Sequence, residues 1–470
     1  MAVEWSGLAP ELLVRLDRSR RGELGAQLQE QLREAIRSGR LAPGERLPST
    51  RAIAGELGVS RGLAQDCYEQ LVAEGYLVAR PGSATRVTED ARPVPSRIRP
   101  AEAAPAPSVD FRSGVPDVAS FPMRDWTWAL GEVGRTAPLS APGYGDPAGR
   151  PELRAVVAAY LRRVRGASVE PELVVICSGF TQGLHLVLHA LARTGHRQLG
   201  VEDPGHRDWA EIADRCGLRP VAVPVDADGA RVRDAGAGVR AAVLTPAHQT
   251  PTGVVMTPER RREAIGWATE RDGVLVEDDY DAEFRYDRQA VGTLQGLAPD
   301  LVVTIWSVSK SLAPALRLGW IVCPPHLAAA IAHEKDLADR GSPALDQLAL
   351  ARLMESGRYD RHLRRMRALY ARKREALVAA LAAHAPGARL TGLAAGFHAV
   401  VRLPDGADED VVARNAAARG VAVYPLSGYR FGVADHPPQL VLGFGNLSEG
   451  AIERGIAAIG DLLTGEATAR

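Results

Sequence analysis

The chain has 470 residues with 57 basic and 57 acidic side chains, so its formal net charge at pH 7 is zero. Hydrophobic residues make up 46% of the chain, which is typical of a globular protein of roughly two to four domains. This charge balance excludes a bulk attraction to nucleic acid or to a membrane surface, so any DNA contact must come from a local patch.

The first elements that the sequence predicts are three short helices before residue 75. Apolar residues recur four positions apart on the first, which ends near Gly39: Leu28, Leu32 and Ile36. Ser49 is the expected N-cap of the second helix, which runs to Leu57 and stops at Gly58. Ser60 caps the third helix, so the last two helices form a helix-turn-helix.

A β-hairpin wing is predicted after the third helix. The stretch "YLVARPGSATRV" has two β-prone runs around Pro81 and Gly82. A helix-turn-helix followed by a wing is a DNA-binding arrangement, and Ser60 and Arg61 stand at the start of the helix that would enter the major groove.

Residues 38–82, "SGRLAPGERLPSTRAIAGELGVSRGLAQDCYEQLVAEGYLVARPG", resemble the DNA-binding domain of the GntR family over essentially its whole length. The resemblance implies that Arg51 holds a phosphate and that Ser60 and Arg61 touch the DNA backbone and a base edge. It also implies that Gly82 lets the wing tip approach the minor groove. The implied partner is a double-stranded DNA operator.

The DNA-binding surface departs from the family pattern at two positions. Gly62 and Leu63 stand where the family usually has Asn-Thr, which leaves base readout to Arg61. The alternative is that these arginines form a solvated face, because acidic and basic residues are equal in number between Arg20 and Asp90.

A linker is predicted at residues 91–108, "ARPVPSRIRPAEAAPAPS", where five prolines interrupt any helix or strand pattern. The expected organisation is therefore multidomain. It comprises an N-terminal extension (1–19), a winged helix-turn-helix domain (20–90), the linker (91–108) and a large C-terminal domain (109–470).

Beyond the linker, short apolar runs alternate with helix-length stretches. The runs are "LVVIC", "QLGVE", "AAVLTP", "GVLVEDD", "LVVTIW" and "GWIVCP". Runs without period-two alternation are typical of strands buried on both faces, so they predict an α/β domain with a mainly parallel central sheet. Because ligands bind beyond the carboxyl ends of such strands, the residues that end each run should line a site.

The strand ends carry reactive and anion-binding groups. "SGFTQG" at residues 178–183 could hold a phosphate at a helix N-terminus, although such a turn is weak evidence alone. Asp278 and Tyr280 end one apolar run, and their side chains should lie on the same side of the strand. The alternative is that this acidic stretch is only solvated, which is the more common case. After another run, Lys310 stands among polar residues that include a fixed cation: Ser307, Ser309 and Arg317.

Lys310 is one of only three lysines, whereas more than fifty residues are arginine. Only a lysine amine loses its proton near neutral pH and condenses with an aldehyde, so a retained lysine suggests chemistry. The alternative is a residual surface lysine, and we expect Lys335 and Lys373 to be of that kind. A phosphate-binding turn, a carboxylate, a phenol, a lysine and an arginine on successive strand ends are together the parts that hold pyridoxal phosphate.

Four stretches resemble fold-type I aminotransferases: "YGDPAGRPELR", "TPAHQTPTG", "EDDYDAEFRYD" and "SVSKSLAPALRLGW". Joined to a GntR-type head, they are similar to the MocR family of bacterial regulators, which includes GabR-like and PdxR-like types. The resemblance implies an α/β fold-type I domain and pyridoxal 5′-phosphate as cofactor, bound to Lys310 as a Schiff base. It also implies a homodimer.

The resemblance assigns the cofactor-binding residues. Asp278 would pair with the pyridine nitrogen and Tyr280 with the ring's phenolic oxygen. The phosphate would be held by the backbone of Gly179 and Phe180, by Ser307 and Arg317, and by Tyr144 of the neighbouring subunit. Ser309 would also belong to the cofactor-binding residues.

Three departures from the aminotransferase pattern concern what the site does. His206 replaces a common Tyr and would still stack on the ring, and Thr250 replaces a common Asn. Val441 stands where transaminases usually place the arginine that grips a substrate carboxylate. Arg207 and Arg430 are the substitutes that we consider for binding an effector.

Three functions remain open on the sequence alone. The first is a transcription regulator whose aminotransferase-like domain senses an amine or amino acid. The second is a working aminotransferase with an ancillary DNA-binding head, and the third makes pyridoxal phosphate itself the effector. The missing carboxylate clamp at Val441 favours a sensor with at most weak half-transamination.

Cysteine spacing and hydropathy restrict the kinds of site and the cellular location that the chain can have. Cys67, Cys177, Cys216 and Cys323 lie far apart without CxxC spacing, so neither a metal site nor a disulfide framework is expected. The N-terminal residues show no signal-peptide pattern, and no apolar run approaches the roughly 20 residues that span a bilayer. We therefore expect a cytoplasmic protein without a membrane partner.

Overall fold

The computed structural model describes residues 14–20, 22–79, 84–89, 107–286, 292–432 and 436–465. The chain divides into two compact units, residues 1–105 and 106–470. The predicted linker lies outside the described residues as far as residue 106. Among the described helices, none is both long and apolar enough to cross a membrane.

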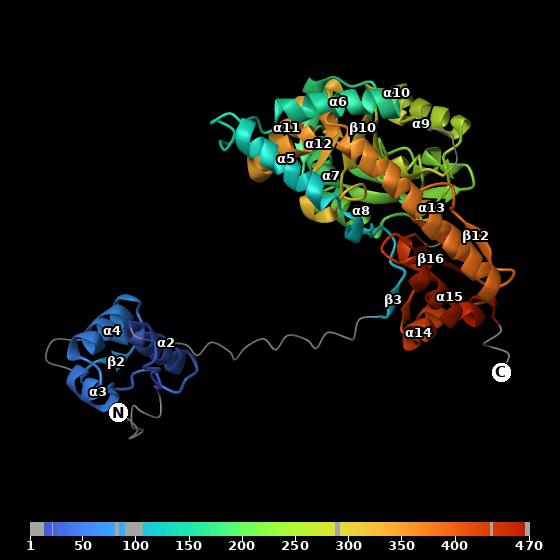
Figure 1. The fold of residues 1–470 in the computed structure, drawn as a ribbon. Coiled ribbons are helices and arrows are strands. Elements are labelled where there is room, and N and C mark those ends of the chain that lie inside the picture. Colours follow the sequence, from blue (N-terminus) through green and yellow to red (C-terminus); the bar gives the residue numbers. More distant parts are fainter. Residues whose placement is uncertain are drawn as a thin grey trace. The chain divides into compact units, whose positions relative to one another are not determined.

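The described part of the first unit is a three-helix domain with a hairpin (Figure 1). Its elements are α2 (Leu24–Arg37), α3 (Thr50–Leu57), α4 (Arg61–Ala73), β1 (Leu77–Val78) and β2 (Arg86–Val87), and the two strands are antiparallel. The Oγ atoms of Ser49 and Ser60 accept the N–H groups of the third residues of α3 and α4, each at 3.2 Å. Gly58 ends α3 with a φ of 60°. The predicted winged helix-turn-helix and its caps are confirmed, whereas Gly82 lies outside the described residues.

The second unit is built on an eight-stranded sheet with the order β4-β11-β10-β9-β8-β5-β6-β7. The strands are β4 (Val174–Cys177), β5 (Gln198–Asp203), β6 (Arg219–Asp226), β7 (Gly229–Ala230), β8 (Ala241–Leu244), β9 (Val274–Asp278), β10 (Val302–Ser307) and β11 (Gly319–Val322). The five strands from β10 to β6 are parallel to one another, whereas β11 is antiparallel to both β10 and β4, and β7 is antiparallel to β6. The predicted, mainly parallel sheet is confirmed.

Both faces of this sheet are buried, as the unbroken apolar runs predict. In β4, Val174 and Ile176 face one hydrophobic core, while Val175 and Cys177 face another. The first core includes residues of α5 (Met123–Thr136), α6 (Pro151–Arg165), α12 (Ala344–Glu355) and α13 (Arg358–His384). The second includes residues of α7 (Phe180–Arg193), α8 (Arg207–Arg215) and α11 (Pro325–Asp339), and a further core packs under α9 (Pro258–Glu270).

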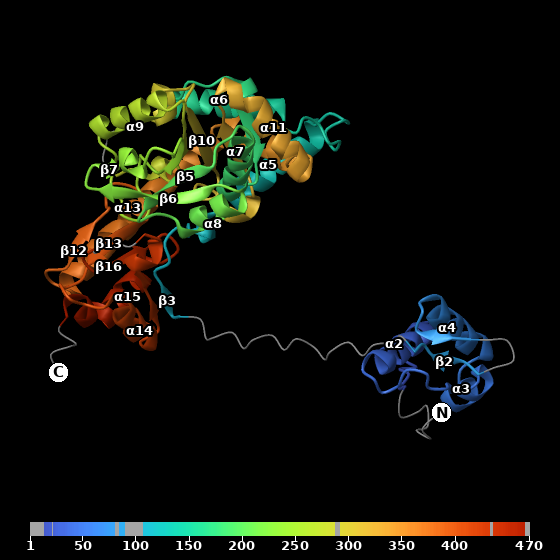
Figure 2. The same cartoon turned by 180° about the vertical axis from the view of Figure 1, so that it is seen from behind.

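A smaller subdomain completes the second unit. It contains an antiparallel sheet with the order β12-β13-β16-β15, covered by α14 (Glu409–Ala418) and α15 (Glu449–Thr464). Its strands are β12 (Arg389–Thr391), β13 (His398–Arg402), β15 (Tyr424–Pro425) and β16 (Gln439–Gly443). The long helix α13 runs from the large sheet to this subdomain (Figures 1 and 2). The first strand of the unit, β3 (Val109–Asp110), pairs there with β14 (Val421–Ala422).

Candidate functional site

A cavity of about 460 Å³ lies in the second unit at the carboxyl ends of the parallel strands. Its lining includes ten residues that the sequence singled out: Phe180, His206, Arg207, Thr250, Asp278, Tyr280, Ser307, Ser309, Lys310 and Arg317. It also includes residues that sequence analysis missed, among them Ser113, Gly114, Trp209, His398 and Tyr429. The structure therefore brings together most of the predicted cofactor-binding residues.

Lys310 lies in the turn that follows β10 and reaches the cavity. Its Nζ donates a hydrogen bond to the carbonyl oxygen of Gly114. Burial lowers the pKa of the Lys310 amine, while the carboxylates of Asp278 and Asp281 oppose that shift. An amine with a lowered pKa is more often unprotonated, which makes it a better nucleophile toward a carbonyl carbon.

The other two lysines are buried, so the expectation that they lie on the surface is wrong. Lys335 is 0% exposed, and its Nζ lies 2.7 Å from a carboxylate oxygen of Asp339 one helical turn away. Lys373 donates to Asp117 Oδ2 and to the Gly445 carbonyl, each at 2.7 Å. Both amines are occupied by structural contacts, and neither lines the cavity.

Asp278 ends β9 and presents a buried carboxylate to the cavity. Its side chain is 8% exposed, and nothing in the described part of the chain hydrogen-bonds to the carboxylate. Burial raises the pKa of Asp278 well above its ordinary value, the neighbouring Asp279 adds to the shift, and Lys310 opposes it. A carboxylate in this setting is stabilised by a cationic N–H group, so the site fits a ligand that supplies one.

Tyr280 follows Asp278 and lines the same cavity. Its hydroxyl accepts a hydrogen bond from Thr250 Oγ1 at 2.8 Å. His248 Nδ1 lies 3.1 Å from the same hydroxyl. These contacts fix the phenol at the cavity wall.

A buried ion pair beside Tyr280 was missed by sequence analysis. His248 Nδ1 lies 2.7 Å from Asp281 Oδ2, and its Nε2 lies 3.3 Å from the Gly392 carbonyl oxygen. Neither acceptor carries a proton to donate, so both ring nitrogens donate and the imidazole is a cation. Burial opposes this charge, but the Asp281 carboxylate outweighs it and raises the pKa of His248.

His398, at the start of β13, is the third member of this cluster and lines the cavity. Its ring centroid lies 4.9 Å from that of His248. Burial and the adjacent His248 lower the pKa of His398 to about 3, so its ring is neutral. The ligand atoms of His248, Asp281 and His398 lie within 4.8 Å of one another, but a metal there would have to displace the proton that His248 Nδ1 shares with Asp281.

An arginine and a glycine lie together at the start of α7. Gly179 precedes the helix with a φ of 102°, and a Cβ there would lie 3.3 Å from the Arg317 guanidinium. Arg317 has no carboxylate partner within the described residues. Free N–H groups of a helix N-terminus beside an unpaired arginine favour a phosphate, and the hydroxyls of Ser307 and Ser309 line the same wall.

An aromatic stack borders the cavity. The ring of His206 stacks on Trp209 with centroids 5.7 Å apart, and Phe180 packs against Trp209 at 5.3 Å. Arg207, the next residue along the chain, is exposed at the rim.

Two predicted residues lie away from the cavity in this chain. Arg430 is outside the lining, and its Nη1 is buried without a hydrogen-bond partner among the described residues. Burial lowers its pKa, while Asp203 and Glu409 oppose the shift. Tyr144 is 87% exposed on the loop that follows α5.

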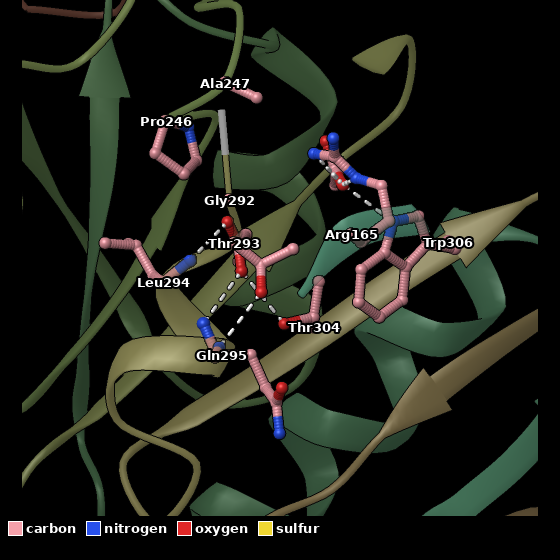
Figure 3. A network of polar contacts seen from close by, with 12 residues as sticks. Arg165, Pro246, Ala247, Gly292, Thr293, Leu294, Gln295, Thr304 and Trp306 are labelled. Atoms are coloured by element: carbon pink, nitrogen blue, oxygen red, sulfur yellow. Dashed lines mark hydrogen bonds and ion pairs between the residues drawn. The ribbon is translucent and has the colours of Figure 1, made fainter. Parts of the chain in front are cut away.

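A second polar layer supports the strand end that carries Asp278 (Figure 3). Asp279 is ion-paired with Arg165 at 2.7 Å and accepts the Trp306 indole N–H at 2.8 Å. Glu277 accepts the Thr304 hydroxyl at 3.0 Å and two backbone N–H groups of α10 (Leu294–Leu297). These contacts lock both residues that flank Asp278, so its own side chain is left to face the cavity.

In the first unit, the predicted DNA-binding residues lie at the start of α3 and α4. Arg51 and Arg61 are exposed, and neither guanidinium contacts a carboxylate within the described residues. The Ser60 hydroxyl serves as the helix cap. The arrangement leaves two free cations beside the helix-turn-helix.

The fold and the cavity define a DNA-binding head joined to an aminotransferase-type domain. Residues 24–87 match the family described as bacterial regulatory proteins, gntR family, and residues 107–459 match aminotransferase class I and II. An archaeal alanine:glyoxylate aminotransferase superposes with a TM-score of 0.69 at 27% identity, covering 76% of this chain and 90% of its own. The α-aminoadipate aminotransferase LysN of Thermus thermophilus, complexed with N-(5′-phosphopyridoxyl)-L-leucine, gives 0.68 at 25% identity, covering 77% and 93%.

Full-length relatives combine both parts. The pyridoxine biosynthesis regulator PdxR of Corynebacterium glutamicum is 33% identical over 93% of this chain and 95% of its own. The probable rhizopine catabolism regulatory protein MocR of Rhizobium meliloti is 31% identical over 94% of each chain. The chain belongs to the MocR family of helix-turn-helix transcriptional regulators.

Proposed function

We propose that the second unit binds pyridoxal 5′-phosphate and senses a small effector, while the first unit binds a double-stranded DNA operator. One observation carries this proposal. A single cavity holds an amine without a carboxylate partner, an unpaired buried carboxylate, a phenol and an arginine beside a helix N-terminus. These groups match the polar groups of pyridoxal phosphate one by one.

Each cofactor group has a candidate partner in the cavity. Lys310 would hold the cofactor covalently, Asp278 would pair with its protonated pyridine nitrogen, and Tyr280 would hydrogen-bond its phenolic oxygen. The phosphate would be bound by the backbone of Gly179 and Phe180, by Ser307 and Ser309, and by Arg317. His206 would stack on the ring. When bound, the cofactor supplies an electron-withdrawing ring and a carbonyl carbon that reacts with amines.

The effector would be an amine, an amino acid or pyridoxal phosphate itself. Arg207 at the exposed rim is our candidate partner for an acidic group, whereas Arg430 faces Asp203 and Glu409 instead. Val441 is fully buried in β16 and offers no charge to a carboxylate. A working aminotransferase is the alternative function, and sustained turnover with an amino donor and a keto acid would establish it.

We further propose a homodimer in which Tyr144 reaches the phosphate of the neighbouring subunit's cofactor. The loop after α5 exposes Leu139 fully and Tyr144 almost fully. Large apolar side chains are rarely presented together in this way unless a partner covers them. The fully exposed leucine therefore supports a second copy of the chain as that partner.

For the first unit, we propose that Arg51 and Ser60 contact DNA phosphates and that Arg61 reads a base edge. Gly82 would bring the wing tip to the minor groove. Residues 20–90 would form this domain behind an extension at 1–19. A linker at 91–108 would connect it to the sensor at 109–470.

The covalent assignment is tested with Lys310→Ala and Lys310→Arg in the full-length protein. The arginine variant keeps the positive charge but cannot condense with an aldehyde. Both variants should lose the yellow absorbance of the bound cofactor and the adduct that borohydride traps on the Lys310 peptide of the parent. If borohydride still trapped the cofactor on either variant, the assignment would be refuted.

A further inference from the structure

His398 is a hydrogen-bond acceptor inside the cavity. The residue is 3% exposed, and its Nε2 lies 3.1 Å from the carbonyl oxygen of Pro251. A carbonyl only accepts, so the ring proton is on Nε2 and the neutral ring keeps a lone pair on Nδ1. Within the described residues Nδ1 has no hydrogen-bond partner, and it is not one of the side-chain atoms sealed from solvent.

The surroundings of His398 keep it in this state. The imidazolium of His248 lies against one side of the ring, with 4.9 Å between the centroids. The Asp281 carboxylate opposes this effect, but it already pairs with His248 at 2.7 Å. Placing a second positive charge on a buried ring beside this cation is unfavourable, so His398 remains an acceptor throughout the neutral pH range.

The cofactor leaves this acceptor unused. The proposed partners of its ring nitrogen, phenolic oxygen and carbonyl carbon are Asp278, Tyr280 and Lys310, and its phosphate has Arg317. The phosphate and the phenolic oxygen are themselves acceptors, so neither can donate to a lone pair. The donor for His398 is therefore either water or a second molecule in the cavity, and a ligand that carries its own donor can replace that water.

We propose that His398 Nδ1 selects an amine effector that carries a second hydrogen-bond donor, a hydroxyl or a second ammonium, over an α-amino acid. A bare nitrogen repels a carboxylate, and Val441 offers no counter-charge for one. An acidic group farther along the effector remains compatible with Arg207 at the rim. This inference rests on the proposed function, because the effector must bind beside the cofactor.

The test uses two pairs of probes that differ in one donor. They are 2-aminoethanol against 2-methoxyethylamine, and 1,3-diaminopropane against propylamine, with glycine as the α-amino acid. Each probe is titrated into the cofactor-loaded, full-length protein, and its dissociation constant is taken from the cofactor absorbance and from calorimetry. Wild type should bind the donor-bearing member of each pair about tenfold more tightly, because a buried acceptor without its donor is costly.

The variants assign this preference to one atom. His398→Phe keeps a planar ring but removes the acceptor, so it should abolish both tenfold ratios. His398→Asn keeps an acceptor and should retain part of each ratio. The exposed His326 provides the matched control, and His326→Asn should behave like wild type.

Two outcomes would overturn the inference. One is that the wild-type protein binds both members of each pair equally, or binds glycine as tightly as 2-aminoethanol. This outcome is measured on wild type alone, so it does not depend on whether a variant folds. The other is a His398→Phe variant that keeps both ratios. Failure of the proposed function looks different, because no probe would then perturb a bound cofactor even in wild type.

Discussion

Glu202, at the end of β5, should make the stability of the second unit depend on pH. Its side chain is 1% exposed and accepts the Thr245 hydroxyl at 2.5 Å, the Thr245 backbone N–H at 3.1 Å and the Gln249 amide at 3.1 Å. Burial raises the pKa of Glu202 from 4.5 to about 7, against the effect of these hydrogen bonds. We predict that Glu202→Gln removes this pH dependence.

The sign and the size of this pH dependence follow from the raised pKa of Glu202. The folded state holds the Glu202 proton more tightly than the unfolded state, so the contribution is fully present below pH 4.5 and is lost as the pH rises through about 7. Each pKa unit corresponds to about 1.4 kcal/mol, so Glu202 alone should lower the free energy of unfolding by about 3 kcal/mol between pH 4.5 and pH 8. Glu202→Gln should therefore match wild type near pH 4.5 and exceed it by about that amount at pH 8.

Urea unfolding followed by tryptophan fluorescence measures this difference, because six of the seven tryptophans lie in the second unit. The exposed Glu453 supplies the control, and Glu453→Gln should run parallel to wild type at every pH. If the difference between wild type and Glu202→Gln were the same at pH 4.5 and pH 8, Glu202 would titrate normally and the reasoning from burial would be wrong.

Three further predictions concern other contacts. Arg61→Ala should weaken specific operator binding by about 1 to 3 kcal/mol in fluorescence anisotropy if Arg61 contacts a base edge, and unchanged affinity would make it a solvated charge. Arg165→Met should lower the free energy of unfolding by about 3 to 5 kcal/mol because it leaves Asp279 buried without its partner, and adding Asp279→Asn should restore part of that loss. Tyr359→Phe removes a 2.9 Å hydrogen bond to Ser311, next to the cavity lysine, and should cost about 1 kcal/mol in chemical unfolding without preventing cofactor binding.

The sequence was sufficient for features that depend on local pattern. Helix caps such as Ser49 and Gly58 follow from neighbouring residues, and strand ends follow from apolar runs, so most of the cavity could be named in advance. The direction of a strand could not be predicted, because an apolar run has the same pattern in a parallel and in an antiparallel strand. The antiparallel β11 was therefore not distinguishable from its parallel neighbours.

Contacts between distant segments explain what was missed. His248, Asp281 and His398 follow or begin three different strands. His248 and Asp281 stand in two of the quoted aminotransferase-like stretches, but neither stretch indicates that the two residues pair or that His398 lies beside them. Their cluster exists only because the small subdomain places β13 against the ends of β8 and β9. A single histidine in a sequence predicts neither its charge nor its neighbours, although the charge decides what His398 can bind.

The lysines show why rarity alone is a poor guide to function. All three were retained by a chain that otherwise uses arginine, yet two of them have structural roles. Lys335 and Lys373 each neutralise a carboxylate at 2.7 Å, which is the ordinary requirement for a buried amine. Lys310 hydrogen-bonds to a backbone carbonyl and forms no ion pair within the described residues. The missing counter-ion at a cavity wall, rather than the scarcity of lysine, therefore supports our proposal that Lys310 is the reactive amine.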